Sequence, residues 1–110
     1  MRFLCLFTGD NSGAPPTQEQ MAQMGAMVEQ SKKEGKLVAT GGLKKRETDG
    51  FSIRRKGDQY TVNDGGAEWA RAGGWAIIEA PTRAQAIEDV KAFLGMAGDG
   101  VSEVIEISYM

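Results

Sequence analysis

The first strand-like run of the chain, RFLCLFT, carries apolar side chains on both of its alternating faces. Phe3, Cys5 and Phe7 lie on one face, and Leu4 and Leu6 lie on the other. A strand with one wet face alternates apolar and polar residues, whereas a strand that is apolar on both faces is buried on both. We therefore expect this strand to lie in the centre of a sheet.

Two capping boxes predict two helices. Thr17 is followed three residues later by Gln20, and Gly35 is suited to end the helix that starts there. Thr82 stands in the same relation to Gln85. The apolar stripes that we expect these helices to bury are Met21, Met24, Met27 and Val28 in the first, and Ile87, Val90 and Leu94 in the second.

Further strands are predicted between and after the helices. They are residues 37–43, the two arms of a hairpin, GFSIRRKG and QYTVNDG, that turns at residues 56–58, the run GWAIIEA, and the run EVIEISYM. In the last run Ile105, Ile107 and Tyr109 share one face, and Glu106 and Ser108 share the other. The order β, α, β, hairpin, β, α, β predicts an α+β fold, a ferredoxin-like plait with an inserted hairpin and both helices on one face of an antiparallel sheet.

This arrangement has a consequence for association. If both helices cover one face, the apolar residues on the other face of the first strand and of GWAII meet water unless something covers them. A second copy of the same sheet is the simplest cover, so we expect a homodimer with its sheets packed face to face.

Length, charge and cysteine content narrow the class of protein. A chain of 110 residues is close to the usual size of one domain, so we expect residues 1–110 to form a single domain. The net charge of -2 and the absence of long apolar runs favour neither nucleic acid nor membrane as a partner. Cys5, the one cysteine, lies in an apolar run and is expected to be a buried free thiol, which fits a cytoplasmic protein.

Basic residues cluster around the predicted hairpin. Six of the 13 Lys and Arg residues lie in this window: Lys44, Lys45, Arg46, Arg54, Arg55 and Lys56. Two interpretations stay open, a solvated hairpin or a modest patch that attracts anions.

The order and spacing of several segments resemble the YCII-related domain family, and in particular its DGPF branch. These segments are MRFLCLFTGD, EGKLVATGGL, YTVNDGGAEW, GGWAIIEA, TRAQAIEDV and VIEI, so the resemblance covers essentially the whole chain. Asp64 and Gly65 match the first half of the DGPF motif, whereas Gly66 and Ala67 stand where the family has proline and phenylalanine. The resemblance implies an α+β plait that dimerises through its sheets as a dimeric α+β barrel.

The resemblance also implies two classes of function. The wider family is similar to small dimeric α+β barrel proteins that include lactone isomerases and dehalogenating enzymes, some with a histidine-aspartate pair suggested as acid-base machinery. This chain has no histidine, so a carboxylate with a pKa raised by burial would have to move the proton. The first hypothesis is a cofactor-independent lyase or isomerase acting on a small carbonyl or aromatic compound. The alternative is a non-catalytic module that binds a small molecule or has a regulatory role, since some relatives look associated with alternative sigma factors.

The candidate residues centre on the stretch VNDGGAEWARAGGW. In the catalytic hypothesis Asp64 is the acid or base, Gly65 and Gly66 let the backbone approach a ligand, and Trp69 forms a lid. Arg54 or Arg55 neutralises an anionic group on the ligand. Residues 63–66, Asn-Asp-Gly-Gly, also fit a simpler interpretation, in which they form only a tight turn.

Trp75 fits the core or a dimer interface better than a pocket, because it opens an apolar strand. The glycines lack the spacing of a phosphate-binding loop, and the chain has no histidine or cysteine pair to ligate zinc. No cofactor or metal is therefore predicted.

Overall fold

The computed structural model describes residues 1–10, 17–65 and 72–108. Its elements are β1 (Arg2–Gly9), α1 (Gln18–Lys33), β2 (Leu37–Gly42), α2 (Arg46–Asp49), β3 (Phe51–Lys56), β4 (Gln59–Asp64), β5 (Gly74–Glu79), α3 (Arg83–Ala97) and β6 (Gly100–Ile107). This order confirms the predicted α+β, ferredoxin-like fold with an inserted hairpin. The single-turn helix α2, which connects β2 to the hairpin, was not predicted from the sequence.

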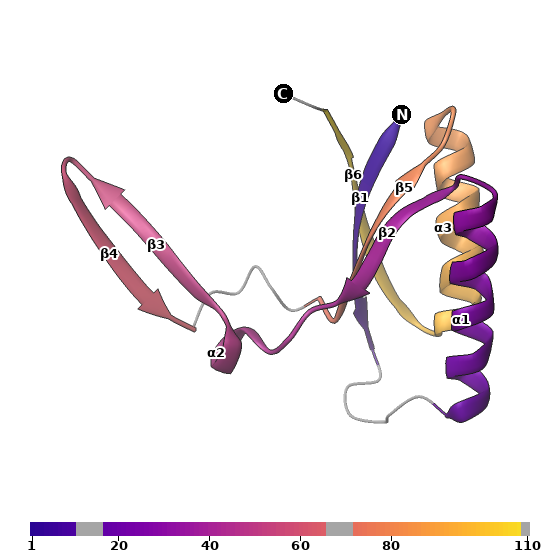
Figure 1. The fold of residues 1–110 in the computed structure, drawn as a ribbon, viewed down its shortest axis with the longest axis horizontal. Helices are drawn as coiled ribbons and strands as arrows, with labels where there is room; N and C mark the ends of the chain where they lie inside the picture. Colours follow the sequence, from indigo (N-terminus) through magenta and orange to yellow (C-terminus); the bar gives the residue numbers. More distant parts are fainter. Residues whose placement is uncertain (11–16, 66–71, 109–110) are drawn as a thin grey trace.

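Four strands form one antiparallel sheet in the order β2-β5-β1-β6. The two-sided apolar strand β1 therefore lies between two neighbours, as predicted. Helices α1 and α3 lie side by side against one face of this sheet (Figure 1), which is also the predicted arrangement.

Both long helices begin at the predicted threonines. Thr17 accepts a hydrogen bond from the Gln20 backbone, and the Gln20 side chain accepts one from the Thr17 backbone, so the first capping box is complete. Thr82 accepts from the Gln85 backbone in the same way. The Gln85 amide donates instead to Asp89. Gly35 follows α1 with a φ of 73°, the left-handed conformation that favours glycine at a helix end.

The core lies between the helices and the sheet. Phe3 and Cys5 are 5% and 7% exposed, and Phe3 packs with Ala80 and Ala86. Phe7, on the same face of β1, makes an edge-to-face contact with Phe93 of α3 at 5.5 Å between ring centroids. Burial raises the pKa of the Cys5 thiol, as expected for a sulfur that acts as a small apolar group.

The predicted apolar stripes are only partly buried. Met21 and Met24 are 61% and 38% exposed, because the first turns of α1 extend beyond the strands and α3 (Figure 1). Ile87 of α3 is also exposed, at 42%. The buried residue of α3 is Ala86, so the buried stripe is centred one residue earlier and Ile87 lies at its margin.

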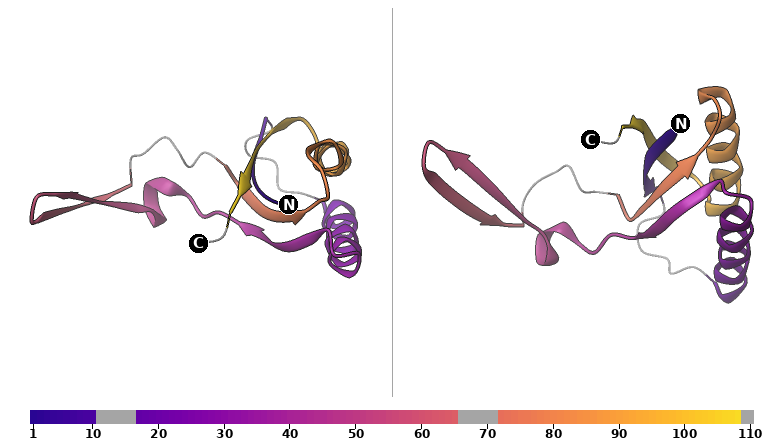
Figure 2. Two further views of the ribbon diagram at one scale, coloured as in Figure 1. Left: turned by 90° about the horizontal axis from the view of Figure 1, so that it is seen from above. Right: turned by 45° about the horizontal axis from the view of Figure 1, so that its top comes forward.

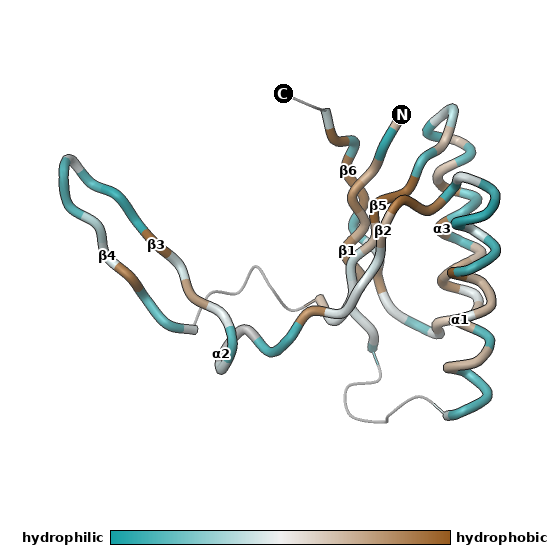
Figure 3. The backbone as a smooth tube through the Cα atoms, viewed as in Figure 1, coloured by the Kyte–Doolittle hydropathy of each residue, from teal (hydrophilic) through white to brown (hydrophobic). Residues whose placement is uncertain are grey.

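The opposite face of the sheet carries apolar side chains and is not covered by a helix; we call it the open face. Phe3 faces the helices, so its neighbours in β1 and their register partners point the other way. The larger apolar residues of the open face are Leu4, Leu6, Trp75, Ile77, Val101, Ile105 and Ile107. Figure 3 shows these central strands as the most hydrophobic part of the backbone.

Trp75 lies on the open face and crosses the neighbouring strand. A methyl group placed on Gly41 of β2 would lie 2.7 Å from the indole Nε1 of Trp75, so the absence of a side chain at Gly41 makes room for the ring. The indole therefore forms part of a flat apolar wall on this face.

The β3–β4 hairpin (residues 51–64) forms a separate two-stranded sheet. It turns at Gly57, which has a φ of 61°, at the predicted position. The hairpin projects away from the four-stranded sheet in all three views (Figures 1 and 2), and the molecule measures 47 × 36 × 20 Å along its principal axes. All of its strand residues are exposed.

Candidate functional site

The β3–β4 hairpin has two chemically different faces. Residues paired across an antiparallel ladder point to the same side, and side chains alternate along each strand. One face, the polar face, carries Ser52, Arg54, Lys56, Gln59, Thr61 and Asn63. The other, the apolar face, carries Phe51, Ile53, Arg55, Tyr60, Val62 and Asp64. The adjacent arginines Arg54 and Arg55 therefore point to opposite sides.

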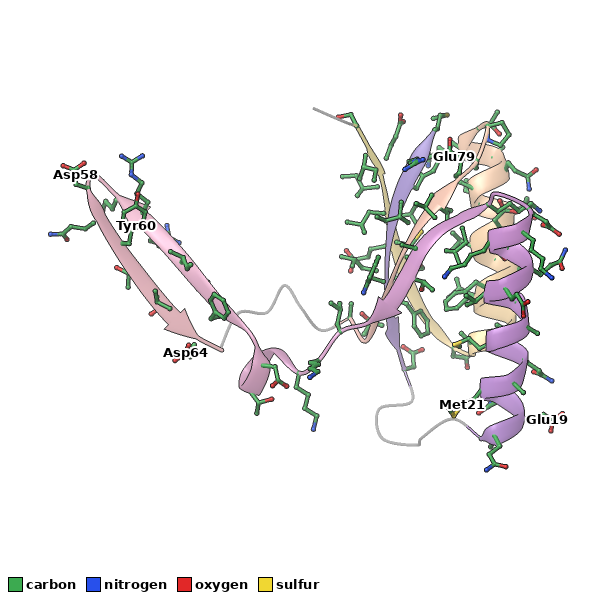
Figure 4. All side chains as sticks on the ribbon, in the orientation of Figure 1. Glu19, Met21, Asp58, Tyr60, Asp64 and Glu79 are labelled. Carbon is green, nitrogen blue, oxygen red and sulfur yellow. The ribbon has the colours of Figure 1, made fainter. Side chains whose placement is uncertain are left out.

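Asp64 ends β4 at the base of the hairpin, on its apolar face, and is exposed in the single chain. Figure 4 places Asp64 at the end nearest the sheet and Tyr60 at the far end. Gly65 follows with a φ of 67° and donates its backbone N–H to the carbonyl of Gly50 at 2.8 Å. This bond closes the base of the hairpin, so Gly65 has a conformational role whether or not the site binds a ligand.

Arg54 lies beside a shallow hollow on the hairpin. The hollow has a volume of about 400 Å³ and is lined by Ser52, Ile53, Arg54, Arg55 and Asn63. Three of these five residues belong to the polar face and supply a hydroxyl, a guanidinium and a carboxamide group. Hydrogen-bond donors around a fixed positive charge suit a small anion such as a carboxylate or phosphate.

The structure does not bring all the predicted site residues together in one chain. Asp64 and Arg54 lie on opposite faces of the hairpin. Asp64 and Arg55 share a face, but Arg55 pairs with Tyr60, four residues before Asp64, which corresponds to roughly 13 Å along a strand. A single ligand that contacts both Asp64 and an arginine would therefore need groups from outside this hairpin.

Two of the predicted site residues, Gly66 and Trp69, lie outside the described residues. Within the described ranges, no group of three or more carboxylate or thiol side chains is close enough to hold a metal ion. None of the helices described has the length and apolar content that a membrane span requires.

Two sets of polar residues on these surfaces were not predicted from the sequence. Asn63 and Ser52 face each other across the hairpin and line the hollow beside Arg54. Glu103 lies on the open face of the sheet, where its register partner is Leu6. Alternation along β6 carried this second signal, since Glu103, Ile105 and Ile107 are each two residues apart.

Comparison with protein-family models adds a whole-chain match. The model of the YCII-related domain matches residues 1–110. A search of the curated proteins found no match.

Proposed function

The chain belongs to the YCII-related domain family, and from this premise we propose that it acts as a homodimer that binds a small anionic molecule on the polar face of its hairpin. The observation that carries the proposal is the hollow of about 400 Å³ that Arg54, Ser52 and Asn63 line together with Ile53 and Arg55. Its donors suit a carboxylate, and its size suits a compact molecule. Membership of the DGPF branch stays a prediction that rests on Asp64 and Gly65.

The uncovered open face supports the homodimeric part of this proposal. Its central row consists of Leu4, Ile77 and Ile105, and Leu6 and Trp75 lie in the row beside it. Ile105 is 65% exposed, although it lies in a strand of the main sheet. A contiguous apolar surface of this kind is typical of an interface, and a second copy related by a two-fold axis can cover it.

A catalytic form of the proposal assigns proton transfer to Asp64. Asp64 lies on the apolar face of the hairpin, and a carboxyl group can take the acid-base role that histidine has in other sites. The compound would be a small carbonyl or aromatic acid, and its anionic group would be held by groups from outside this hairpin, because Arg54 lies on the opposite face from Asp64.

Titration calorimetry with benzoate, acetate and phosphate tests the binding proposal. We expect one of these anions, or a larger carboxylate found by thermal-shift screening, to bind with a dissociation constant that rises about tenfold or more in Arg54→Ala, since a charge-assisted contact is lost. Lys56→Ala is the matched control, because Lys56 is a cation on the same face that does not line the hollow. Equal affinities of the wild type and Arg54→Ala would contradict the assignment.

The variant Asp64→Asn separates binding from catalysis. If the ligand is a substrate, this variant should retain ligand affinity and the dimeric state but lose turnover, because the amide cannot accept a proton. Turnover that survives in Asp64→Asn would exclude Asp64 as the acid or base and leave the binding function standing.

A further inference from the structure

The apolar face of the β3–β4 hairpin is exposed along its whole length. Phe51, Ile53, Tyr60 and Val62 are 60%, 61%, 68% and 61% exposed. A two-stranded hairpin is marginally stable in water on its own, and it needs a third strand or a packed apolar face to become stable. The hairpin would therefore become more stable if another protein surface packed on its apolar face.

Charged residues mark the two ends of this apolar face. Arg55 lies toward the tip, Asp64 lies at the base, and the cross-strand pair Ile53 and Val62 lies between them. The face thus carries a positive charge, an apolar row and a negative charge in sequence. Arg55 has no ion-pair partner in the described part of the chain.

The open face of the four-stranded sheet carries an acidic side chain at one end and an ion pair at the other. Glu103 lies in one row, Ile105 lies in the next with Leu4, and Arg2 lies in the third, where it bonds to Glu79. Glu103 and the row of Arg2 are four residues apart along β6, as are the two end rows of the hairpin, so both spacings are roughly 13 Å. The two surfaces therefore match in apolar character and in spacing, and Arg55 of the hairpin matches Glu103 of the sheet in charge.

Charge along the adjacent strands strengthens the match. Residues 99–107 include three acidic side chains and no basic one, whereas β3 ends in Arg54, Arg55 and Lys56. Glu103 has no ion-pair partner among the described residues. When an apolar surface is covered, a lone carboxylate on it must gain a partner or become costly to bury.

We infer that the hairpin of one copy of this chain lies with its apolar face on the open face of a second copy, with Arg55 against Glu103 of that copy. The exchange is reciprocal about a two-fold axis, so each dimer contains two such contacts. This inference rests on the proposed homodimer, and it replaces the sheet-on-sheet contact expected from the sequence with a contact in which the hairpin of each copy covers the open face of the other.

The position of the hairpin favours a second copy over its own sheet. The chain leaves the main sheet where Leu43 donates a backbone hydrogen bond to Gly73, and the base of the hairpin is closed by the bond from Gly65 to Gly50. Between these two closures the hairpin extends away from its own open face (Figures 1 and 2). Its apolar face is therefore available to another molecule.

Charge reversal tests the contact. By sedimentation equilibrium, we expect Arg55→Glu and Glu103→Arg each to raise the dimer dissociation constant about tenfold or more, because each places like charges opposite one another. A mixture of the two variants should form a heterodimer with nearly wild-type affinity, since both of its contacts join opposite charges. Recovery on mixing requires that the contact join two chains.

Matched controls come from the neighbouring positions. Arg54→Glu makes the same charge reversal as Arg55→Glu but on the polar face of the hairpin, and Glu106→Arg makes the same reversal as Glu103→Arg but on the helix-facing side of β6. Both controls should leave the dimer dissociation constant within about threefold of the wild-type value. Four outcomes overturn the inference. The hairpin contact is overturned, and the homodimer kept, if neither reversal changes the dimer dissociation constant or if each reversal changes it no more than its control does. The hairpin contact is also overturned if dimer affinity recovers only when both changes are in one chain. A monomeric wild type overturns the homodimer as well.

Discussion

The four-stranded sheet and the β3–β4 hairpin are both antiparallel, and their strands have similar lengths, yet their environments differ. Every residue of β5 is at least half-buried, whereas every residue of β3 and β4 is exposed. The difference lies in what covers each sheet, because α1 and α3 cover one side of the main sheet and no helix covers the hairpin (Figure 1). Strand-forming sequence and hydrogen-bond pairing are thus not enough to bury a strand.

The residues that stabilise the fold and the residues predicted to bind a ligand lie in different regions. The charged residues predicted to act on a ligand, Arg54, Arg55 and Asp64, lie on the hairpin, and the buried residues Phe3 and Cys5 lie in the main sheet. Substitutions in the two regions should therefore have different readouts.

The largest expected effect comes from truncating the same side-chain type in each region. Phe3→Ala should lower the free energy of unfolding by about 3–5 kcal/mol, because it opens a cavity in the core. Phe51→Ala, measured by urea denaturation at a protein concentration where the chain is monomeric, should lower it by less than about 1 kcal/mol, since Phe51 is 60% exposed.

The same pair is also compared at high protein concentration. There Phe51→Ala should shift the monomer–dimer equilibrium toward monomer. A Phe51→Ala variant as destabilised as Phe3→Ala in the monomer would show that the hairpin packs within its own chain.

A smaller effect is expected at Gly41. Gly41→Ala should destabilise the protein by about 1–3 kcal/mol and change the tryptophan emission, because the added methyl would lie 2.7 Å from the Trp75 indole nitrogen. Gly42→Ala is the control, since its nearest contact would be the Gly73 carbonyl at 3.7 Å, an ordinary distance. Equal effects of the two substitutions would contradict the packing of Trp75 over Gly41.

The smallest expected effect is the pH dependence contributed by Cys5. Burial raises the pKa of its thiol above the ordinary value of 9.0, so the folded protein binds this proton more tightly than the unfolded chain does. The contribution to stability is therefore fully present below pH 9.0 and is lost as the pH rises toward the folded pKa. The difference in unfolding free energy between the wild type and Cys5→Ala, measured from pH 7 to pH 10, should shrink as the pH rises; a difference that grows would contradict the burial of the thiol.

Much of the fold could be predicted because its signals are local. The capping box at Thr17, the helix start at Thr82 and the two-sided apolar run of β1 each depend on a few neighbouring residues, and each was confirmed, although only half of the capping box predicted at Thr82 forms. The exposure of Met21 and Met24 could not be predicted, because it depends on how far α1 extends beyond its neighbours rather than on helical spacing.

The candidate site was harder to predict, because side-chain direction across a hairpin decides it. Proximity in sequence suggested that Arg54 and Arg55 were equivalent, but strand alternation sends them to opposite faces. Glu103 was missed because its proposed partner lies on another molecule, which the alternation of residues along β6 does not reveal. The role of Asp64 stays a prediction for the same reason.

Hydrogen–deuterium exchange as a function of protein concentration tests the central claim most directly. If a second copy covers the hairpin, amide protection in residues 51–64 should rise with concentration across the dimer transition, whereas protection in β1 should already be high in the monomer. Protection of residues 51–64 that does not change between the monomeric and dimeric states would contradict the account.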